Sequence, residues 1–258
     1  ADQNYKITPE QLEAAITPKT RWLILNSPSN PTGAAYSGEE LKALAEIILP
    51  HKDMMVMTDD MYEHIWYADF PFTTIAQVCP ELYDRTLTVN GCSKAYAMTG
   101  WRIGFAGGPE WLIGAMRKLQ SQSTSNPCSI SQAAAVAALN GPQDDVRRFC
   151  AAFEERRDLV VERIAQIDGL TLDPPGGAFY GLIGCADLIG AQTADGDTLF
   201  DDAGVTAYIL KDAGIAAVPG SAYELSPFFR ISTAASMDVL GQAMDRIAAS
   251  VTKLKRKT

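Results

Sequence analysis

The sequence is poor in the residues that hold metals and disulfides. It has only two histidines, His51 and His64, in 258 residues, and its five cysteines are scattered and never spaced C-x-x-C. A multi-histidine metal site, a zinc site built on cysteine pairs and a disulfide framework are therefore not expected. The cysteines are instead expected to be the reduced thiols of a cytoplasmic protein.

Long apolar runs and an excess of positive charge are also missing. No stretch reaches the ~20 apolar residues that a membrane helix needs, and no signal-peptide pattern is seen at the N-terminus. The 22 basic residues are outnumbered by 31 acidic ones, which gives a net charge of −9. This balance argues against nucleic acid or an anionic membrane as a partner, so we expect a cytoplasmic protein with small-molecule ligands.

The first half of the chain alternates short apolar runs with helix-like segments. Apolar runs predict strands at 21–25, 54–57, 85–90 and 101–106. A helix is predicted after Ser37, which can cap it, because Leu41, Leu44 and Ile48 follow at helical spacing. This alternation predicts an α/β fold with a mostly parallel sheet, whose ligands bind at the carboxyl ends of the strands.

The second half begins with a change of pattern. Residues 143–167 predict one long helix with an apolar stripe, and a Pro/Gly-rich segment ends it. Beyond it we expect strands at 178–182, 215–218 and 228–232, with helices near 198–213 and from Met237 onward. We interpret residues 1–145 as part of a larger ligand-binding domain and residues 146–258 as a smaller α/β domain entered through the long helix.

Two polar loops follow the first two predicted strands. The segment Asn26–Gly33 holds two prolines and a glycine, which demand a rigid turn and favour cis X-Pro bonds. Such rigidity would hold the Asn30 amide toward a ligand, although a plain surface turn explains the loop equally well. In the next loop Asp59 is a candidate functional carboxylate, whereas Asp60 is expected to be an ordinary helix N-cap.

A third loop joins the predicted strands 85–90 and 101–106. Ser93 and Lys94 lie between Gly91 and Gly100, in a run of small residues that would let a flat ligand approach closely. A lone lysine in a loop is usually a solvated charge, so only the neighbouring residues support a functional role for Lys94. Arg102 is expected at the start of the following apolar strand, where a buried guanidinium would need an anionic partner.

Taken together, these loops resemble a known family. The chain is similar to the class I aminotransferases of the fold-type-I pyridoxal-phosphate enzymes, especially bacterial aspartate aminotransferases. The matching stretches occur in the family's order: SPSNPTG at 27–33, D-x-x-Y at 59–62, SKAYAMTGWRIGF at 93–105, PGGAFY at 175–180 and FRIS at 229–232. Departures are minor: Thr233 and Cys128 stand where relatives often carry other residues, which affects substrate detail only.

The resemblance implies a role for each matching residue. It implies that Lys94 carries pyridoxal 5′-phosphate as a Schiff base and later moves the substrate proton, and that Asp59 keeps the pyridine nitrogen protonated. It implies that Tyr62 and Asn30 bind the cofactor's phenolic oxygen, and that Ser93 and Arg102 hold its phosphate. Arg230 is expected to bind the substrate α-carboxylate, and Asn126 is a further candidate for the substrate pocket.

The same resemblance implies an incomplete large domain. Family members extend upstream of the position that matches Ala1, with further sheet, a loop that completes the phosphate site and an aromatic residue that stacks on the ring. We therefore expect the fragment itself to have weak or no activity, and its full-length form to be a cytoplasmic homodimer. Aspartate with 2-oxoglutarate is the first substrate hypothesis and prephenate transamination the second.

Three other interpretations are weighed against transamination. The chain could be a catalytically silent module that keeps the fold for binding or assembly. It could also catalyse another fold-type-I reaction, such as β-elimination or decarboxylation, because the fold does not fix the reaction. Nucleotide binding is poorly supported, because the sequence has neither a G-x-G-x-x-G after a strand nor a Walker lysine loop.

Overall fold

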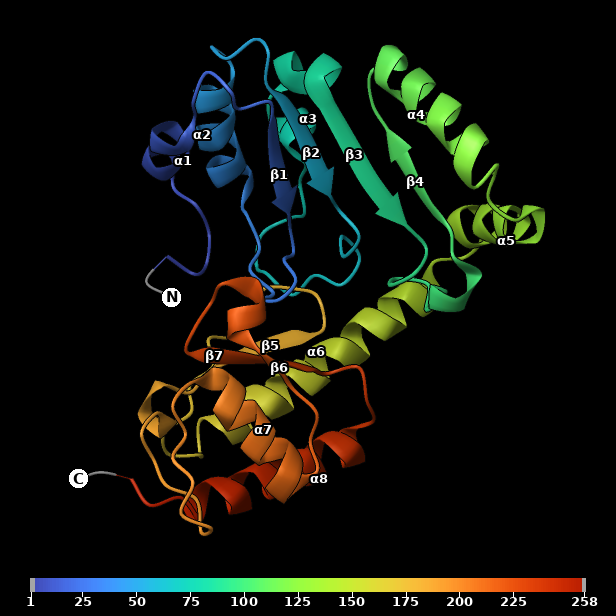
Figure 1. The fold of residues 1–258 in the computed structure, drawn as a ribbon. Coiled ribbons are helices and arrows are strands. Elements are labelled where there is room, and N and C mark those ends of the chain that lie inside the picture. The colour runs from blue at the N-terminus through green and yellow to red at the C-terminus, as the bar shows by residue number, and fades with distance from the viewer. Residues whose placement is uncertain (1–2, 257–258) are drawn as a thin grey trace. The chain divides into compact units, whose positions relative to one another are not determined.

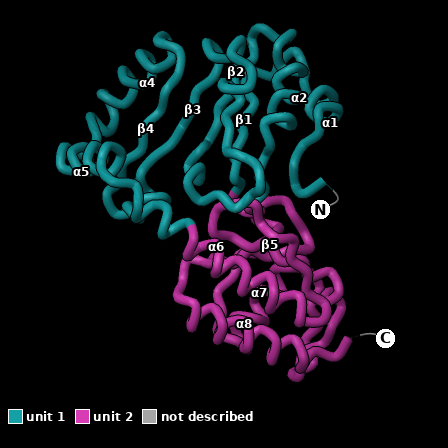
Figure 2. The backbone as a smooth tube through the Cα atoms, turned by 180° about the vertical axis from the view of Figure 1, so that it is seen from behind, with its two compact units in different colours: residues 1–29, 34–150 teal, residues 30–33, 151–258 magenta. Residues whose placement is uncertain are grey.

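The computed structural model describes residues 3–256, which form two compact units (Figure 1, Figure 2). Unit 1 comprises Ala1–Ser29 and Ala34–Cys150, and unit 2 comprises Asn30–Gly33 and Ala151–Thr258. The boundary after Cys150 lies inside one long helix, α6 (Asp144–Ile164). It remains a prediction that residues 1–145 belong to the cofactor-binding domain and residues 146–258 form the small domain.

Unit 1 is built on a four-stranded sheet in the order β1-β2-β3-β4 (Figure 1). Its strands are β1 (Trp22–Asn26), β2 (Met55–Asp59), β3 (Thr86–Gly91) and β4 (Gly104–Gly107). The first three are mutually parallel and β4 runs antiparallel to β3, which confirms the expected α/β class with a mostly parallel sheet. The carboxyl ends of three consecutive strands therefore meet at one edge.

The helices of unit 1 differ in how much they bury. The unit contains α1 (Pro9–Ala15), α2 (Gly38–Ile48), α3 (Ile75–Val78), α4 (Glu110–Ser123) and α5 (Ser129–Asn140). Helix α2 packs Leu41, Leu44 and Ile48 into a core with Leu25 and Val56 of the sheet. Helix α4 has no buried residue, so its packing contributes little to the stability of the unit.

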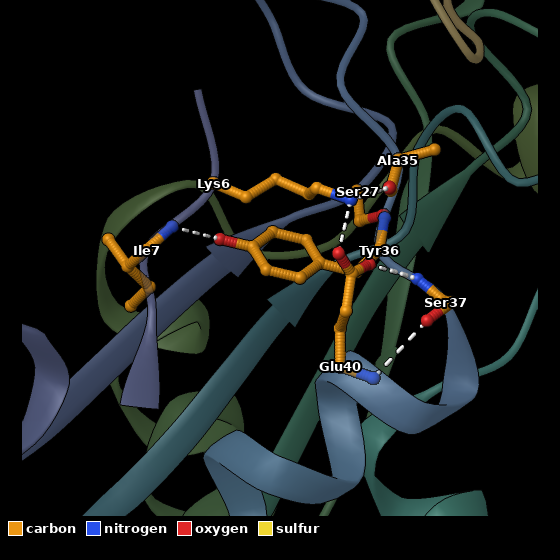
Figure 3. A network of polar contacts seen from close by, with 7 residues as sticks. All are labelled: Lys6, Ile7, Ser27, Ala35, Tyr36, Ser37 and Glu40. Carbon is orange, nitrogen blue, oxygen red and sulfur yellow. Dashed lines mark hydrogen bonds and ion pairs between the residues drawn. The ribbon is translucent and has the colours of Figure 1, made fainter. Parts of the chain in front are cut away.

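A polar network fixes the segment that leads into α2 (Figure 3). Ser37 caps the helix by accepting from the Glu40 backbone N–H at 3.2 Å, while a Glu40 carboxylate oxygen accepts from the Ser37 N–H at 2.8 Å. Lys6 pairs with Glu40 and also donates to the Ala35 carbonyl at 3.2 Å. Burial raises the pKa of Glu40, but the hydrogen bonds from Lys6 and Ser37 outweigh it, so the pKa is lowered.

Unit 2 holds a three-stranded antiparallel sheet in the order β5-β7-β6. Its elements after α6 are β5 (Tyr180–Gly184), α7 (Asp202–Ala213), β6 (Val218–Pro219), β7 (Phe228–Ser232) and α8 (Met237–Thr252). One apolar cluster joins α6, α7 and α8 to the sheet, with Phe229 and Ile209 fully buried. No helix among residues 3–256 is both long and apolar enough to cross a lipid bilayer.

Several predicted boundaries are wrong. The strand expected at 101–106 begins only at Gly104, because Thr99–Trp101 forms a 3-10 turn and Arg102 adopts a left-handed conformation, φ 51°. The strand expected at 178–182 is displaced to Tyr180–Gly184, and the one expected at 215–218 shrinks to two residues. The expectation of an N-cap at Asp60 is also wrong, since hydrogen-bonded turns and not a helix follow it.

Candidate functional site

Three polar strand ends lie side by side in unit 1. In the parallel register Asn26 of β1 faces Asp59 of β2, and Asp59 faces Val89 of β3. The Asn26 side-chain amide donates to the Asp59 carbonyl at 2.9 Å, and the Asp60 N–H donates to the Val89 carbonyl at 2.9 Å. The loops that follow β2 and β3 therefore start at the same edge of the sheet, where ligands of parallel sheets bind.

The turn after β2 places Asp59 and Tyr62. A carboxylate oxygen of Asp59 accepts from the Met61 N–H at 3.3 Å, which bends the chain immediately after the strand. The Tyr62 carbonyl accepts from the Ile65 N–H at 2.8 Å, and its side chain is buried, with 5% of its surface exposed. Asp59 and Tyr62, predicted from the D-x-x-Y pattern, are thus held in one short turn.

Asp60 is the unexpected group in this turn. It is buried, with 4% of its surface exposed, and its carboxylate accepts from the Thr58 hydroxyl at 3.4 Å. Burial raises the pKa of Asp60 to about 7, and the neighbouring charges of Glu63 and Asp59 add to this, while the Thr58 hydrogen bond opposes it. A carboxyl group that titrates near neutral pH therefore lies directly beside Asp59.

Ser93 and Lys94 lie in the turn that follows β3. Both are half-buried, and the Lys94 carbonyl accepts from the Ala97 N–H at 3.2 Å. At the start of this turn Gly91 leaves no room for a side chain: a Cβ there would lie 3.1 Å from the Met61 Cε and 3.1 Å from the Gly104 Cα. The close approach brings the turn that holds Asp59 and Tyr62 next to the point where the lysine loop begins.

Arg102 and Asn126 are more exposed than the other predicted residues of unit 1. The Arg102 guanidinium donates to the Thr99 carbonyl at 2.9 Å and makes no ion pair with any residue between 3 and 256. The expected position of Arg102 at the start of a strand is wrong, because the strand starts two residues later. Asn126 lines a groove of about 380 Å³ at the end of α4, together with Arg117 and Lys118.

The two predicted residues of unit 2 contact each other directly. Arg230 on β7 donates from Nη1 to the side-chain oxygen of Asn30 at 2.7 Å. Its guanidinium carbon lies 4.6 Å from the centre of the Tyr180 ring and 5.2 Å from that of Tyr223. Arg230 Nε is buried and finds no acceptor in the part of the chain that the structure describes. Arg230 thus forms no ion pair with a carboxylate among residues 3–256, although its side chain is held by Asn30 and lies close to the two rings.

Several of these residues were not predicted from the sequence, although a signal existed for two of them. Strand alternation places Val56, Thr58 and Asp60 on the buried face of β2 and its continuation and leaves Asp59 on the other, so extending the predicted strand 54–57 by three residues would have identified Asp60. Tyr180 is the last residue of the recognised PGGAFY stretch, but its contact with Arg230 depends on the pairing of β5 with β7. Asn26 and Tyr223 carried no local signal.

A comparison with protein-family models shows to which family the chain belongs. The model described as "Aminotransferase class I and II" matches residues 1–247, so the chain belongs to the class I and II aminotransferase family. A curated aspartate aminotransferase of Rhizobium meliloti strain 1021 is 56% identical over 254 residues, which cover 98% of this chain and 62% of that protein. An aspartate/prephenate aminotransferase of Cereibacter sphaeroides is 54% identical, covering 96% of this chain and 62% of the relative.

Solved structures of aminotransferases support this family assignment. The crystal structure of the aspartate aminotransferase from Rhizobium meliloti matches with a TM-score of 0.96 and 55% identity, over 99% of this chain and 64% of that one. An aspartate aminotransferase of Thermus thermophilus, solved with maleate, matches with a TM-score of 0.85 and 38% identity, over 96% and 62%. This chain therefore spans about 62% of the length of the curated relatives named above.

Proposed function

We propose that the chain takes part in pyridoxal-phosphate-dependent transamination, with aspartate as amino donor and 2-oxoglutarate as acceptor. The observation that carries the proposal is the shared sheet edge in unit 1, where the Asp59–Tyr62 turn and the Lys94 loop begin in register. Family membership supplies the reaction class, and the relatives named as aspartate aminotransferases supply the substrate.

The residues of unit 1 fit this cofactor chemically. Arg102 has no ion pair among residues 3–256 and can hold a phosphate, together with the Ser93 hydroxyl. When bound, pyridoxal phosphate supplies an electron sink for the pair released as the substrate Cα–H bond breaks.

Each proposed role follows from the chemistry of the side chain. The Lys94 amine holds the cofactor and then, once free, takes the proton from the substrate Cα. The Asp59 carboxylate keeps a proton on the ring nitrogen, and Tyr62 and Asn30 donate to the cofactor's phenolic oxygen. The Arg230 guanidinium binds the substrate carboxylate, and Asn126 stays a candidate for lining the substrate pocket.

The family resemblance extends the proposal to partners and location. We propose that the protein works as a homodimer in the cytoplasm on amino acid and 2-oxo acid substrates. A second candidate function is prephenate transamination, because a relative that is 54% identical is named as an aspartate/prephenate aminotransferase.

Covalent labelling tests the proposal. Incubation with pyridoxal phosphate, reduction with borohydride and peptide mapping should place one stable label on Lys94. Lys94→Ala should abolish the label, while Lys42→Ala, which removes an exposed lysine of α2, should leave it unchanged. A label spread over many lysines, or none at Lys94, would contradict the proposal and favour a silent module. Rates with aspartate, glutamate and prephenate-derived donors then rank the substrates.

A further inference from the structure

The Arg230 guanidinium lies over the rings of two tyrosines that come from different elements of unit 2. Tyr180 begins β5 and is buried, with 8% of its surface exposed, and Tyr223 ends the 3-10 helix Gly220–Tyr223. The antiparallel register pairs Leu182 with Arg230, so Tyr180 is the diagonal neighbour on the same face of the sheet. The guanidinium therefore lies against two rings that come from different elements, one from β5 and one from the 3-10 helix.

The Tyr180 ring is supported from behind by further aromatic rings. Phe179 lies 4.8 Å from Tyr180 between ring centres, and Phe153 of α6 stacks on Phe179 at 5.2 Å with an angle of 26° between the planes. The guanidinium of Arg156 lies 5.2 Å from the Phe153 ring. Aromatic side chains have few rotatable bonds, so this series keeps Tyr180 in place against Arg230.

The electrostatic consequence concerns how the charge of Arg230 is balanced. A partly buried guanidinium is usually paired with a carboxylate, yet the acceptor here is the neutral amide oxygen of Asn30. Ring faces attract a cation through their quadrupole but do not neutralise its charge. An incoming carboxylate therefore meets a positive charge that no carboxylate within the described range 3–256 neutralises, and the arginine is already ordered.

We propose that Tyr180 and Tyr223 are positioning residues that hold the Arg230 guanidinium ready for a carboxylate ligand. The inference rests on the proposed function, because it deepens the role given there to Arg230. Neither tyrosine is required to touch the substrate. Their contribution lies in the ring faces, so phenylalanine should replace either of them and leucine should not.

Direct binding to the purified chain tests the inference without any turnover. The probe is succinate, an unreactive dicarboxylate, titrated by calorimetry and by the ¹⁵N–¹H signal of the Arg230 Nε–H group, assigned through Arg230→Lys. In the parent chain this signal should be shifted upfield by the two rings and should move on succinate addition. Tyr180→Leu and Tyr223→Leu should each weaken binding about 3- to 10-fold and reduce the upfield shift.

Controls separate a positioning role from a loss of structure. Tyr180→Phe and Tyr223→Phe should keep both the affinity, within about twofold, and the shifted signal. Tyr208→Leu, which removes a half-buried tyrosine on α7 away from Arg230, should leave both unchanged. Leucine variants that bind succinate as tightly as the parent overturn the inference, as does a parent signal at the position of a free arginine.

The inference and the proposed function fail in different ways. If Lys94 takes the borohydride label while the tyrosine variants change nothing, the inference is overturned and the proposed function stands. If Lys94 stays unlabelled, the proposed function is contradicted whatever the tyrosine variants do. In steady-state assays of an active preparation, the leucine variants should raise KM for both substrates more than they lower kcat, which a general loss of folded protein would not do.

Discussion

The two units differ in how completely they cover their apolar residues. Unit 2 packs three helices against its sheet, and Phe229, Ile183 and Ile209 are fully buried. Unit 1 buries one face of its sheet under α2 and α3, but leaves large apolar side chains exposed on other elements, among them Ile24 of β1, Phe105 of β4, Trp111 and Leu119 of α4, and Ile130 and Val136 of α5.

The difference shows that the presence of a regular helix or strand does not by itself indicate how stable that segment is. Helices α2 and α4 both form, yet α2 buries four residues and α4 buries none. Isolated helices of this length are marginal in water, so packing decides how firmly each is held. Local opening should therefore be easy in α4 and α5 and rare in the core of unit 2.

The largest expected effect compares two phenylalanines on strands, one in the central strand of the sheet of unit 2 and one in an edge strand of the sheet of unit 1. Phe229 on β7 is 0% exposed, and Phe105 on β4 is 45% exposed. Phe229→Ala should cost about 3–5 kcal/mol of unfolding free energy, because it leaves a cavity in a closed core. Phe105→Ala should cost less than about 1 kcal/mol. Urea unfolding followed by circular dichroism measures both, and equal losses would remove the distinction between the units.

A second prediction uses pH to address unit 1 alone. The folded-state pKa of Asp60 is about 7 against an ordinary 3.8, so the folded state binds this proton more tightly than the unfolded state does. Stability from Asp60 is therefore present at low pH and is lost as pH rises from about 4 through 7, by at most about 4 kcal/mol. Asp60→Asn, which mimics the protonated group, should flatten this decline and be more stable than the parent at pH 8.

The control for this prediction is a neighbouring exposed carboxylate. Asp53→Asn removes a carboxylate that lies on the surface just before β2, and it should leave the slope of stability against pH unchanged. His64 lies 3.3 Å from Glu63, so His64→Gln, which leaves Asp60 intact, serves as a second comparison. A parent whose stability rises between pH 5 and 8 would contradict the role given to Asp60.

The sequence predicted best those elements whose pattern and ends are both local. Strand β7 matches its predicted bounds, and β1, β3 and α8 match theirs within about one residue, because apolar runs and capping residues mark them. Helix α2 follows its expected cap at Ser37 for the same reason. The α/β class and the aminotransferase family followed from these patterns and from motifs preserved in order.

Features that depend on tertiary contacts were not predictable in this way. The left-handed Arg102 shortens β4, and a non-glycine residue in that conformation has no sequence signature. Helices α4 and α5 were not predicted: α5 has no clear apolar stripe, and α4, although Leu112, Met116 and Leu119 recur at helical spacing, buries none of its residues. The burial of Asp60 and the enclosure of Arg230 follow from strand pairing, which single loops do not encode.

The smallest expected effect compares two serine N-caps, one in each unit. Ser37 of unit 1 forms a capping box with Glu40, whereas Ser236 of unit 2 accepts from the Val239 N–H at 3.3 Å without a reciprocal side chain. Each Ser→Ala change should cost about 1 kcal/mol. Ser37→Ala should cost slightly more, because it removes the acceptor of the Glu40 N–H and with it one half of a reciprocal capping box. Hydrogen exchange separates the two variants. Ser37→Ala should speed exchange of the first turn of α2 and leave α8 unchanged, and Ser236→Ala should speed exchange of the first turn of α8 and leave α2 unchanged.

Exchange that speeds up in both helices after either change would mean that the two units unfold together. The contrast between the units would then apply to their packing and not to their stability.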